Sequence, residues 1–281
     1  MIKELIFSHS GNIGDILYSL HFVKDVIEWK KPETAYYILT FGKQGVYAEK
    51  HPDGNVQMTK KSAEFVKPLL MQSGLFKDVQ IVDYNQFEQL RGQLPDYIDL
   101  DEFRVKKLNF MGGDIRNWYY ALSNYHFKKD FSEDLFKGKL EGDIRAKDKV
   151  LVTYTERVNN YFIDISLCLC NHKDNVAFIG IDSEYERIKK ILGYDIPRFE
   201  LKDMEDAAKL MKGSKGVIGN QGGLFSLAEM LKVPRVLIPP QYILYGSQIT
   251  IGPCNNHPIG GDCDVVQTIE QAVHLPDFLF E

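Results

Sequence analysis

The chain has 281 residues, a length that suits one large domain or two smaller ones. It carries 34 Lys and Arg against 39 Asp and Glu, a net charge of −5, which argues against a nucleic-acid-binding surface because such surfaces show a basic surplus. With 44% hydrophobic residues, 17 Phe and 15 Tyr, the chain is not expected to be disordered, and no stretch approaches the ~18 apolar residues of a membrane span.

The start of the chain and its cysteines indicate an intracellular protein. Lys3 and Glu4 interrupt the first apolar residues, so no signal peptide is expected. Four cysteines are too few for a disulfide scaffold in a chain of this length. We therefore expect a reduced, cytoplasmic protein.

Strand-like and helix-like segments alternate through the first half of the chain. Ile16, Leu20, Val23 and Ile27 recur at spacings of three to four, which predicts a helix over residues 15–29. A second helix is expected at residues 62–73. Buried strands are expected at residues 3–8, 35–40 and 79–83. Residues 101–142 are rich in aromatic and charged side chains and are interpreted as helix and irregular connection.

The alternation resumes near Lys149. Ser183 and Glu186 form a capping-box pattern, which predicts a helix over residues 183–192 with Ser183 as its N-cap. The further expected helices are residues 203–212, 222–231 and a short one at 268–273. The expected strands are residues 149–155, 176–181, 199–201, 216–219 and 235–238.

This alternation predicts an α/β fold with parallel sheets covered by helices. A polar break at residues 141–149 indicates a linker between two α/β halves, residues 1–145 and 146–281. A single large doubly wound sheet is the competing interpretation. Open parallel sheets bind ligands at the carboxyl ends of their strands, so the loops that follow the strands are where a site is expected.

The first such loop lies between the first strand and the first helix. Gly11 and Gly14 permit a sharp turn, and the following helix start offers N–H groups and a positive dipole end to an anion. The spacing is neither that of G-x-G-x-x-G nor that of a P-loop. Asp15 fits a residue of the helix N-terminus, which spacing alone favours, or a general base. The candidate ligand-contacting residues of this loop are His9, Ser10, Gly11, Asn12, Gly14 and Asp15.

A second glycine-rich loop follows the strand expected at residues 216–219. Gly222 and Gly223 would let a phosphate approach a helix N-terminus, or they serve only a tight turn between strand and helix. Its candidate residues are Gln221, Gly222, Gly223, Leu224 and Ser226. Two such loops at equivalent points of two α/β halves favour a functional interpretation over a purely structural one.

Three more residues at strand ends are candidates for ligand binding. Arg157 would bind a diphosphate through its fork of donors, or pair with a neighbouring carboxylate at the surface. Gly180 and Asp182 end another strand and would contact a base or ribose, or simply start the next turn. No metal site is predicted, because Cys254, His257, Asp262 and Cys263 match no compact zinc spacing. Cys168 and Cys170 lie in an apolar run and are expected in the core.

Together the two loops resemble glycosyltransferase family 9, the ADP-heptose:lipopolysaccharide heptosyltransferases and their relatives. The family's first loop carries Gly-Asp before an amphipathic helix, as Gly14-Asp15-Ile16-Leu17 does here. Its second domain carries Asp-Thr-Gly-Leu-Ser-His-Leu, which residues 221–227 resemble, with Gln221 in place of the Asp and Ser226 in place of the His. Pro234 then leads the next strand, as in the family.

The resemblance implies a GT-B fold, in which two Rossmann-like domains face a central cleft. Residues 1–145 would then form the acceptor-side domain, with Asp15 as general base, and residues 146–281 the nucleotide-sugar-binding domain. It further implies an inverting, metal-independent transfer of a sugar from a nucleotide-diphosphate sugar to a saccharide or glycolipid acceptor, with no cofactor. The product would belong to lipopolysaccharide or another surface glycan, and the enzyme would work in the cytoplasm, with peripheral contact to the inner face of the membrane.

Three alternatives remain open. Residues 11–15 also resemble the start of polysaccharide pyruvyl transferases, although Ile16 stands where those proteins usually have Glu. The substitutions at Gln221 and Ser226 suit a non-catalytic nucleotide-sugar-binding protein with a degenerate cleft. A nucleotide-sugar epimerase or hydrolase would need further carboxylates and a histidine in the site, which the sequence alone does not locate.

Overall fold

The computed structural model describes residues 2–45, 55–106, 115–123, 127, 131–155, 165–170, 172–238, 263–265 and 279–280. The chain clusters into two compact units. The first comprises Met1–Met111, Ile115–Phe131 and Asp203–Glu205, and the second comprises Gly112–Asp114, Ser132–Lys202 and Asp206–Glu281. Residues 132–145, grouped with the first half on sequence alone, cluster with the second unit.

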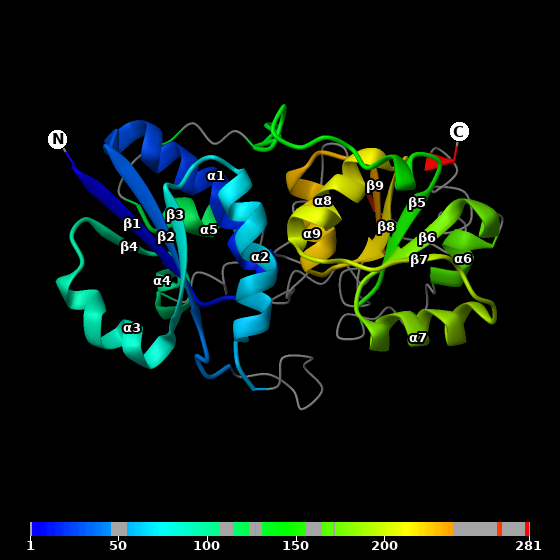
Figure 1. Ribbon diagram of the computed structural model, residues 1–281, viewed down its shortest axis with the longest axis horizontal. Coiled ribbons are helices and arrows are strands. Elements are labelled where there is room, and N and C mark those ends of the chain that lie inside the picture. Colours follow the sequence, from blue (N-terminus) through cyan, green and yellow to red (C-terminus); the bar gives the residue numbers. More distant parts are fainter. Residues whose placement is uncertain are drawn as a thin grey trace. The chain divides into compact units, whose positions relative to one another are not determined.

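A four-stranded parallel sheet forms the centre of the first unit (Figure 1). Its order is β3-β2-β1-β4, with the strands β1 (Glu4–His9), β2 (Thr34–Phe41), β3 (Asp78–Asp83) and β4 (Tyr97–Asp99). The strands expected at residues 3–8, 35–40 and 79–83 are confirmed. Strand β4 was not expected, since only three residues pair and Pro95 and Asp96 precede them.

Helices accompany every strand of this sheet. They are α1 (Ile13–Lys30), α2 (Lys60–Gln72), α3 (Tyr84–Leu90), α4 (Glu102–Val105) and α5 (Ile115–Ala121), with a 3-10 turn at Arg91–Gln93. The start of α2 is capped by the Thr59 hydroxyl, which accepts the Ser62 N–H at 3.1 Å. Helix α1 begins at Ile13, two residues before its expected start, so Gly14 lies inside its first turn and Asn12 is the N-cap.

The second unit is built on a six-stranded parallel sheet. Its order is β10-β9-β8-β5-β6-β7, with the strands β5 (Val150–Thr153), β6 (Val176–Ile179), β7 (Arg198–Phe199), β8 (Gly216–Asn220), β9 (Arg235–Ile238) and β10 (Cys263–Val265). Every residue of β5, β6, β8 and β9 is buried, because a parallel sheet is covered on both faces. This burial explains why these strands appear in the sequence as short apolar runs.

The helices of the second unit are α6 (Ile165–Leu169), α7 (Asp182–Leu192), α8 (Met204–Gly213) and α9 (Gly223–Met230), with 3-10 turns at Ile144–Ala146 and Lys173–Asn175. The predicted capping box of α7 is wrong. The helix starts at Asp182, one residue early, and the Glu184 carboxylate accepts the Ile181 N–H at 3.4 Å, whereas Glu186 pairs with Lys189. The helix expected at residues 268–273 lies outside the described residues.

The cysteine prediction is half right. Cys168 is buried in the core of the second unit, as expected. Cys170 is exposed, because α6 ends at Leu169 and the next residue no longer follows the buried face of the helix. Of the other two cysteines, only the backbone of Cys263 is described, in β10.

Two contacts fix the middle of the second sheet. A side chain at Gly219 would place its Cβ 2.3 Å from the Thr153 carbonyl oxygen, so β8 and β5 approach closely only because residue 219 is glycine. Beside this pair, Arg235 of β9 and Glu229 of α9 form an ion pair in which the side chains are 1% and 3% exposed. Arg235 also donates to the Val233 carbonyl at 2.9 Å.

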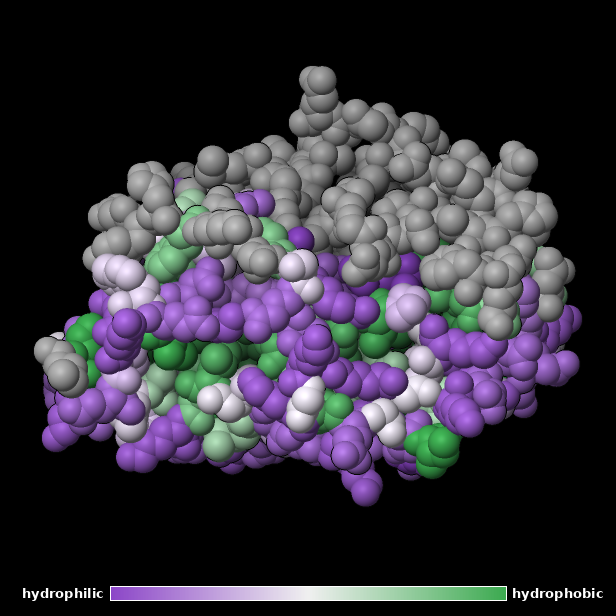
Figure 2. Space-filling view, turned by 90° about the horizontal axis from the view of Figure 1, so that it is seen from above, coloured by the Kyte–Doolittle hydropathy of each residue, from purple (hydrophilic) through white to green (hydrophobic). Residues whose placement is uncertain are grey.

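The surface of the described residues is predominantly hydrophilic on the face that Figure 2 shows. The large hydrophobic residues that the described part exposes are spread over both units: Trp29, Met71, Leu90, Val105, Ile144 and Ile181. Among the described residues, no helix is both long enough and apolar enough to cross a membrane.

Candidate functional site

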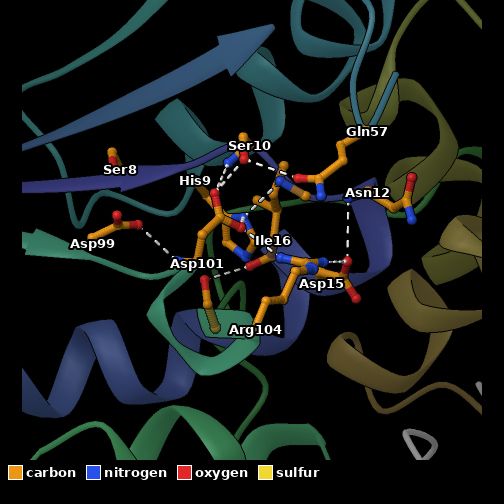
Figure 3. A network of polar contacts seen from close by, with 12 residues as sticks. Ser8, His9, Ser10, Asn12, Asp15, Ile16, Gln57, Asp99, Asp101 and Arg104 are labelled. Atoms are coloured by element: carbon orange, nitrogen blue, oxygen red, sulfur yellow. Dashed lines mark hydrogen bonds and ion pairs between the residues drawn. The ribbon is translucent and has the colours of Figure 1, made fainter. Parts of the chain in front are cut away.

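A network of charged and polar side chains lies in the first unit at the carboxyl ends of β1 and β4 (Figure 3). The strand order reverses here, because the chain adds β2 and β3 on one side of β1 and returns to add β4 on the other. Ligands of open α/β sheets bind at this kind of switch point. The topology therefore places the first glycine-rich loop beside the residues that follow β4.

Asp101, two residues beyond β4, is the centre of the network. Its Oδ2 accepts the Ser10 N–H at 2.7 Å and the Ser10 hydroxyl, and its Oδ1 accepts from Arg104 Nη1 at 2.5 Å. Lys43 Nζ lies 3.7 Å from Oδ2. The side chain is only 6% exposed. A carboxylate this deep in a protein is tolerated because several donors compensate for its lost hydration.

These donors set the charge state of Asp101. His9 belongs to this set as well, because its Nδ1 lies 3.1 Å from Asp101 Oδ1. Burial raises the pKa of the Asp101 carboxyl, but His9, Arg104 and Lys43 lower it by more, so its pKa lies well below the usual range. Asp101 is therefore ionised at every pH at which the protein is expected to work.

The lowered pKa makes a pH-dependent contribution to stability. A carboxyl whose pKa is lower in the folded than in the unfolded chain stabilises the fold fully above its unfolded pKa of about 3.9 and loses this contribution as pH falls toward the folded value. We expect the stability difference between the unaltered protein and Asp101→Asn to shrink by about 1 kcal/mol between pH 7 and pH 3. Urea unfolding at both pH values measures this stability difference. A difference that stays constant with pH would contradict a lowered pKa of Asp101.

Asp15 is the third residue of α1 and is joined to Asp101 through Arg104. Its Oδ2 accepts the N–H of the N-cap residue Asn12 at 3.2 Å and forms an ion pair with Arg104 Nη2. Both contacts go to this one oxygen, and Figure 3 shows the other oxygen of Asp15 pointing away from Arg104. The side chain is 17% exposed, so the carboxylate is held firmly but is open to solvent at one edge.

His9 connects the network to α5. Its Nε2 lies 2.9 Å from the Tyr119 hydroxyl, which donates to the Asp15 carbonyl at 2.8 Å. Burial raises the pKa of Tyr119, and the charge of Asp15 adds to this effect, so the hydroxyl stays protonated. Because that hydroxyl donates its only proton to the carbonyl, His9 Nε2 must carry the hydrogen between them. His9 is completely buried, so it supports the first glycine-rich loop from the protein interior.

Gly11 makes room for this network. A Cβ at this position would lie 2.5 Å from the His9 ring and 2.8 Å from Arg104 Nη2. Its N–H lies 2.8 Å from His9 Nδ1. The first loop therefore needs glycine at position 11, because the His9 ring and the Arg104 guanidinium occupy the space that a larger residue would need.

The second glycine-rich loop lies at the carboxyl end of β8 in the second unit. Gly222 is the N-cap of α9 in an extended conformation, and Gly223 is the first helical residue. Gln221 is 9% exposed. The Ser226 hydroxyl donates back to the Gly222 carbonyl at 3.0 Å, while Leu224 follows in the first turn. The N-terminus of α9 thus opens from this loop, as the sequence predicted.

Asn220 fixes the neighbouring strand end. Its Oδ1 accepts the Thr155 N–H at 2.7 Å and its Nδ2 donates to the Thr155 carbonyl at 2.7 Å. This amide therefore takes the place of a backbone hydrogen-bonding partner just beyond β5 and fixes the backbone at Thr155. Arg157 lies outside the described residues.

Gly180 and Asp182 follow β6, where the sequence placed them. Gly180 has a φ of +153° and its carbonyl accepts from Arg198 at 3.1 Å. Asp182 begins α7 and pairs with the same arginine at 2.6 Å, although its own side chain is 91% exposed. Their contacts among the described residues are thus with Arg198 of the edge strand β7.

The sequence interpretation missed the residues that surround Asp15. Asp101 and Arg104 fell within the segment interpreted as helix and irregular connection, where α4 and α5 are indeed helical, and neither they nor Asp99 and Tyr119 were singled out. A signal was present, because Asp99 and Asp101 directly follow a short apolar segment and Arg104 stands three residues on. Among the described residues no cluster of His, Cys, Asp and Glu suits a metal ion.

Comparison with known proteins supports the fold. No protein-family model and no curated protein matches the sequence. Among solved structures, the chain is similar to E. coli heptosyltransferase WaaC with ADP, at 12% identity and a TM-score of 0.64, and with ADP-2-deoxy-2-fluoro heptose, at 13% and 0.60. Both matches cover 98% of this chain and 98% of the other.

A third match is a glycosyltransferase family 9 protein from Veillonella parvula, at 12% identity and a TM-score of 0.50, covering 99% of this chain and 97% of the other. The α/β, GT-B-like fold class with two parallel-sheet units is therefore confirmed.

Proposed function

We propose that the chain is a glycosyltransferase of the heptosyltransferase type, which moves a sugar from a nucleotide-diphosphate sugar to a hydroxyl of a saccharide or glycolipid acceptor. One observation carries the proposal. A carboxylate, Asp15, is held at the carboxyl end of the N-terminal sheet with one oxygen fixed and the other directed away from its partners, in a chain with the fold of the heptosyltransferases.

In the proposed reaction Asp15 is the general base. It takes the proton of the acceptor hydroxyl as that oxygen attacks the anomeric carbon of the donor. The bond from the anomeric carbon to the diphosphate breaks, and its electron pair leaves with the nucleoside diphosphate. Attack opposite the leaving group inverts the anomeric configuration.

The residues of the second unit would bind the donor. The N–H groups at the start of α9, after Gly222, suit the charge that develops on the leaving diphosphate. Arg157 would add a positive charge, while Gln221 and the backbone near Gly180 would contact the nucleoside. The proposed transfer, with Asp15 as base and these groups binding the donor, needs neither a metal ion nor an organic cofactor.

Among the described residues, the two buried polar groups nearest Asp15 do not favour an epimerase or hydrolase. Such an enzyme would need a further carboxylate and a histidine that reach the substrate. Asp101 and His9 stand next to Asp15, but both are buried and are occupied by Ser10, Arg104 and Tyr119. The Ser10 hydroxyl donates to Asp101 and makes no hydrogen bond to His9 among these contacts, so no activated serine is formed.

The first test is a thermal-shift screen with ADP, UDP, GDP and CMP and their common sugar conjugates. A ligand at 100 times its dissociation constant adds about 2.7 kcal/mol to the free energy of unfolding, a readily visible shift. We expect one nucleoside diphosphate and its sugar conjugate to stabilise the protein. The absence of any shift would overturn the proposal and favour a pyruvyl transferase, whereas a shift without turnover of the sugar conjugate would favour a non-catalytic nucleotide-sugar-binding protein.

A second test, on turnover instead of binding, addresses the acceptor. We propose a cytoplasmic enzyme that contributes to lipopolysaccharide or another surface glycan, with peripheral contact to the membrane. Release of the nucleoside diphosphate from the stabilising donor, measured with and without lipid-linked saccharides, distinguishes a membrane-bound acceptor from a soluble one.

A further inference from the structure

We infer that Arg104 is a positioning residue for Asp15 and that Asp101 in turn orients Arg104. The inference rests on the proposed function, because it assigns the machinery that aims the proposed base.

Arg104 joins the two carboxylates through separate nitrogens. Its Nη1 donates to Asp101 Oδ1 at 2.5 Å, while its Nη2 pairs with Asp15 Oδ2. The guanidinium group is planar and its donors are fixed relative to one another, so the position of Asp101 determines that of the Asp15 oxygen. Lysine, with a single nitrogen on a flexible stem, would not transmit this geometry.

The arginine itself is held on two sides. Its guanidinium carbon lies 4.4 Å from the centre of the Phe103 ring, a cation–π arrangement that supports the flat face of the group. Asp101, its other support, is nearly inaccessible and is tied to the first loop through Ser10. The side chain of Arg104 is 25% exposed, so ions from solution can reach it.

The contacts with Arg104 and Asn12 determine which oxygen of Asp15 can react. Oδ2 already accepts from Arg104 and from the Asn12 N–H, whereas the other oxygen points away from both (Figure 3). In the proposed reaction that second oxygen would receive the acceptor proton. Without Arg104, the carboxylate would keep, among the described residues, only the contact with the Asn12 N–H. It would then rotate about its χ angles, and the reactive oxygen would no longer be aimed.

The experiment compares Arg104→Ala, Arg104→Lys and Asp15→Asn with the unaltered protein. Donor affinity is measured by calorimetry with the nucleotide that stabilises the protein, and kcat by release of nucleoside diphosphate from its sugar conjugate. We expect Arg104→Ala to lower kcat about 100-fold at unchanged donor affinity, since misplacing a reacting group by about 1 Å costs this much. Arg104→Lys is expected to restore only part of the loss.

Added guanidinium ion distinguishes a positioning role from a merely structural one, because only in the first case should it restore kcat of Arg104→Ala. Added at concentrations at which the protein stays folded, it is expected to raise kcat of Arg104→Ala, with urea at the same concentration having no effect. The matched control is Arg145→Ala, because Arg145 also bridges two aspartates, Asp143 at 2.6 Å and Asp206 at 3.2 Å, but at the surface of the second unit. Its kcat should stay unchanged.

The outcomes separate the two proposals. If the unaltered protein releases no nucleoside diphosphate, or if Asp15→Asn is as active as it, the proposed function fails. If both behave as expected but Arg104→Ala is fully active, or is impaired without any response to guanidinium, only the positioning role is overturned. Thermal unfolding of each variant identifies a loss of kcat that comes from misfolding, and Arg104→Lys then decides the question.

Discussion

Replacing Asp15 by asparagine is expected to lower kcat by 10²- to 10⁴-fold while the donor binds as before. General-base catalysis contributes an effect of this size, and an amide cannot accept the proton of the acceptor hydroxyl. The proposed donor-binding residues belong to the second unit, so the affinity for the nucleoside diphosphate should be unaffected. Calorimetry with that nucleotide and an assay of its release from the sugar conjugate measure the two quantities separately.

The matched control is Asp83→Asn. Asp83 also places a carboxylate at a helix start of the first unit, where its Oδ1 accepts the Asn85 N–H at 2.9 Å. Like Asp15 it accepts a backbone N–H at a helix start, here as the N-cap residue rather than as the third helical residue, and it does not belong to the network. An equal loss of binding and turnover in Asp15→Asn, or an equal loss of turnover in Asp83→Asn, would show that Asp15 only caps its helix.

The second large effect is expected in the core of the second unit, where Glu229→Gln should cost about 3–5 kcal/mol of folding free energy. Removing one partner of a buried ion pair leaves the other charge without compensation. Arg235, at 1% exposure, would keep only the Val233 carbonyl among the partners described above. Urea unfolding of the variant and the unaltered protein gives the difference.

A double variant tests the physical cause. In Glu229→Leu with Arg235→Met both charges are absent, so we expect it to be markedly more stable than Glu229→Gln. Glu28→Gln is the surface control: Glu28 pairs with Lys24 at 3.4 Å with 62% of its side chain exposed, and its loss should cost about 1 kcal/mol or less. A double variant as unstable as Glu229→Gln would indicate lost packing as the cause instead.

The sequence predicted the fold well because its strands are buried on both faces. Such strands appear as short apolar runs between glycines and polar residues, and β5, β6, β8 and β9 were all found in this way. Helix α1 was found from its spacing, although its start was misplaced by two residues, since Asn12 rather than a residue near Asp15 caps it. Local patterns of this kind are sufficient wherever near neighbours in the chain decide the conformation.

The candidate site was only half predictable. The first loop could be found by its glycines, but Ser10 and Asp101 are 91 residues apart in the chain, and nothing in the sequence of either indicates the other. The link depends on β4, whose three residues give no periodic signal. The reason for Gly11 was likewise invisible, because the groups that need its space come from Arg104 as well as from nearby His9.

The late position of β4 also sets the order in which the site can form as the chain leaves the ribosome. Strands β1 and β2 can pair once about forty residues have emerged. The Ser10 N–H and hydroxyl cannot bond to Asp101 until β4 and the residues after it, 97–104, have followed. Contacts between distant segments form slowly because the loop must close first. The nascent sheet therefore passes through a stage in which the Ser10 N–H is still hydrated, and the network is completed only when Asp101 and Arg104, and after them Tyr119, have followed.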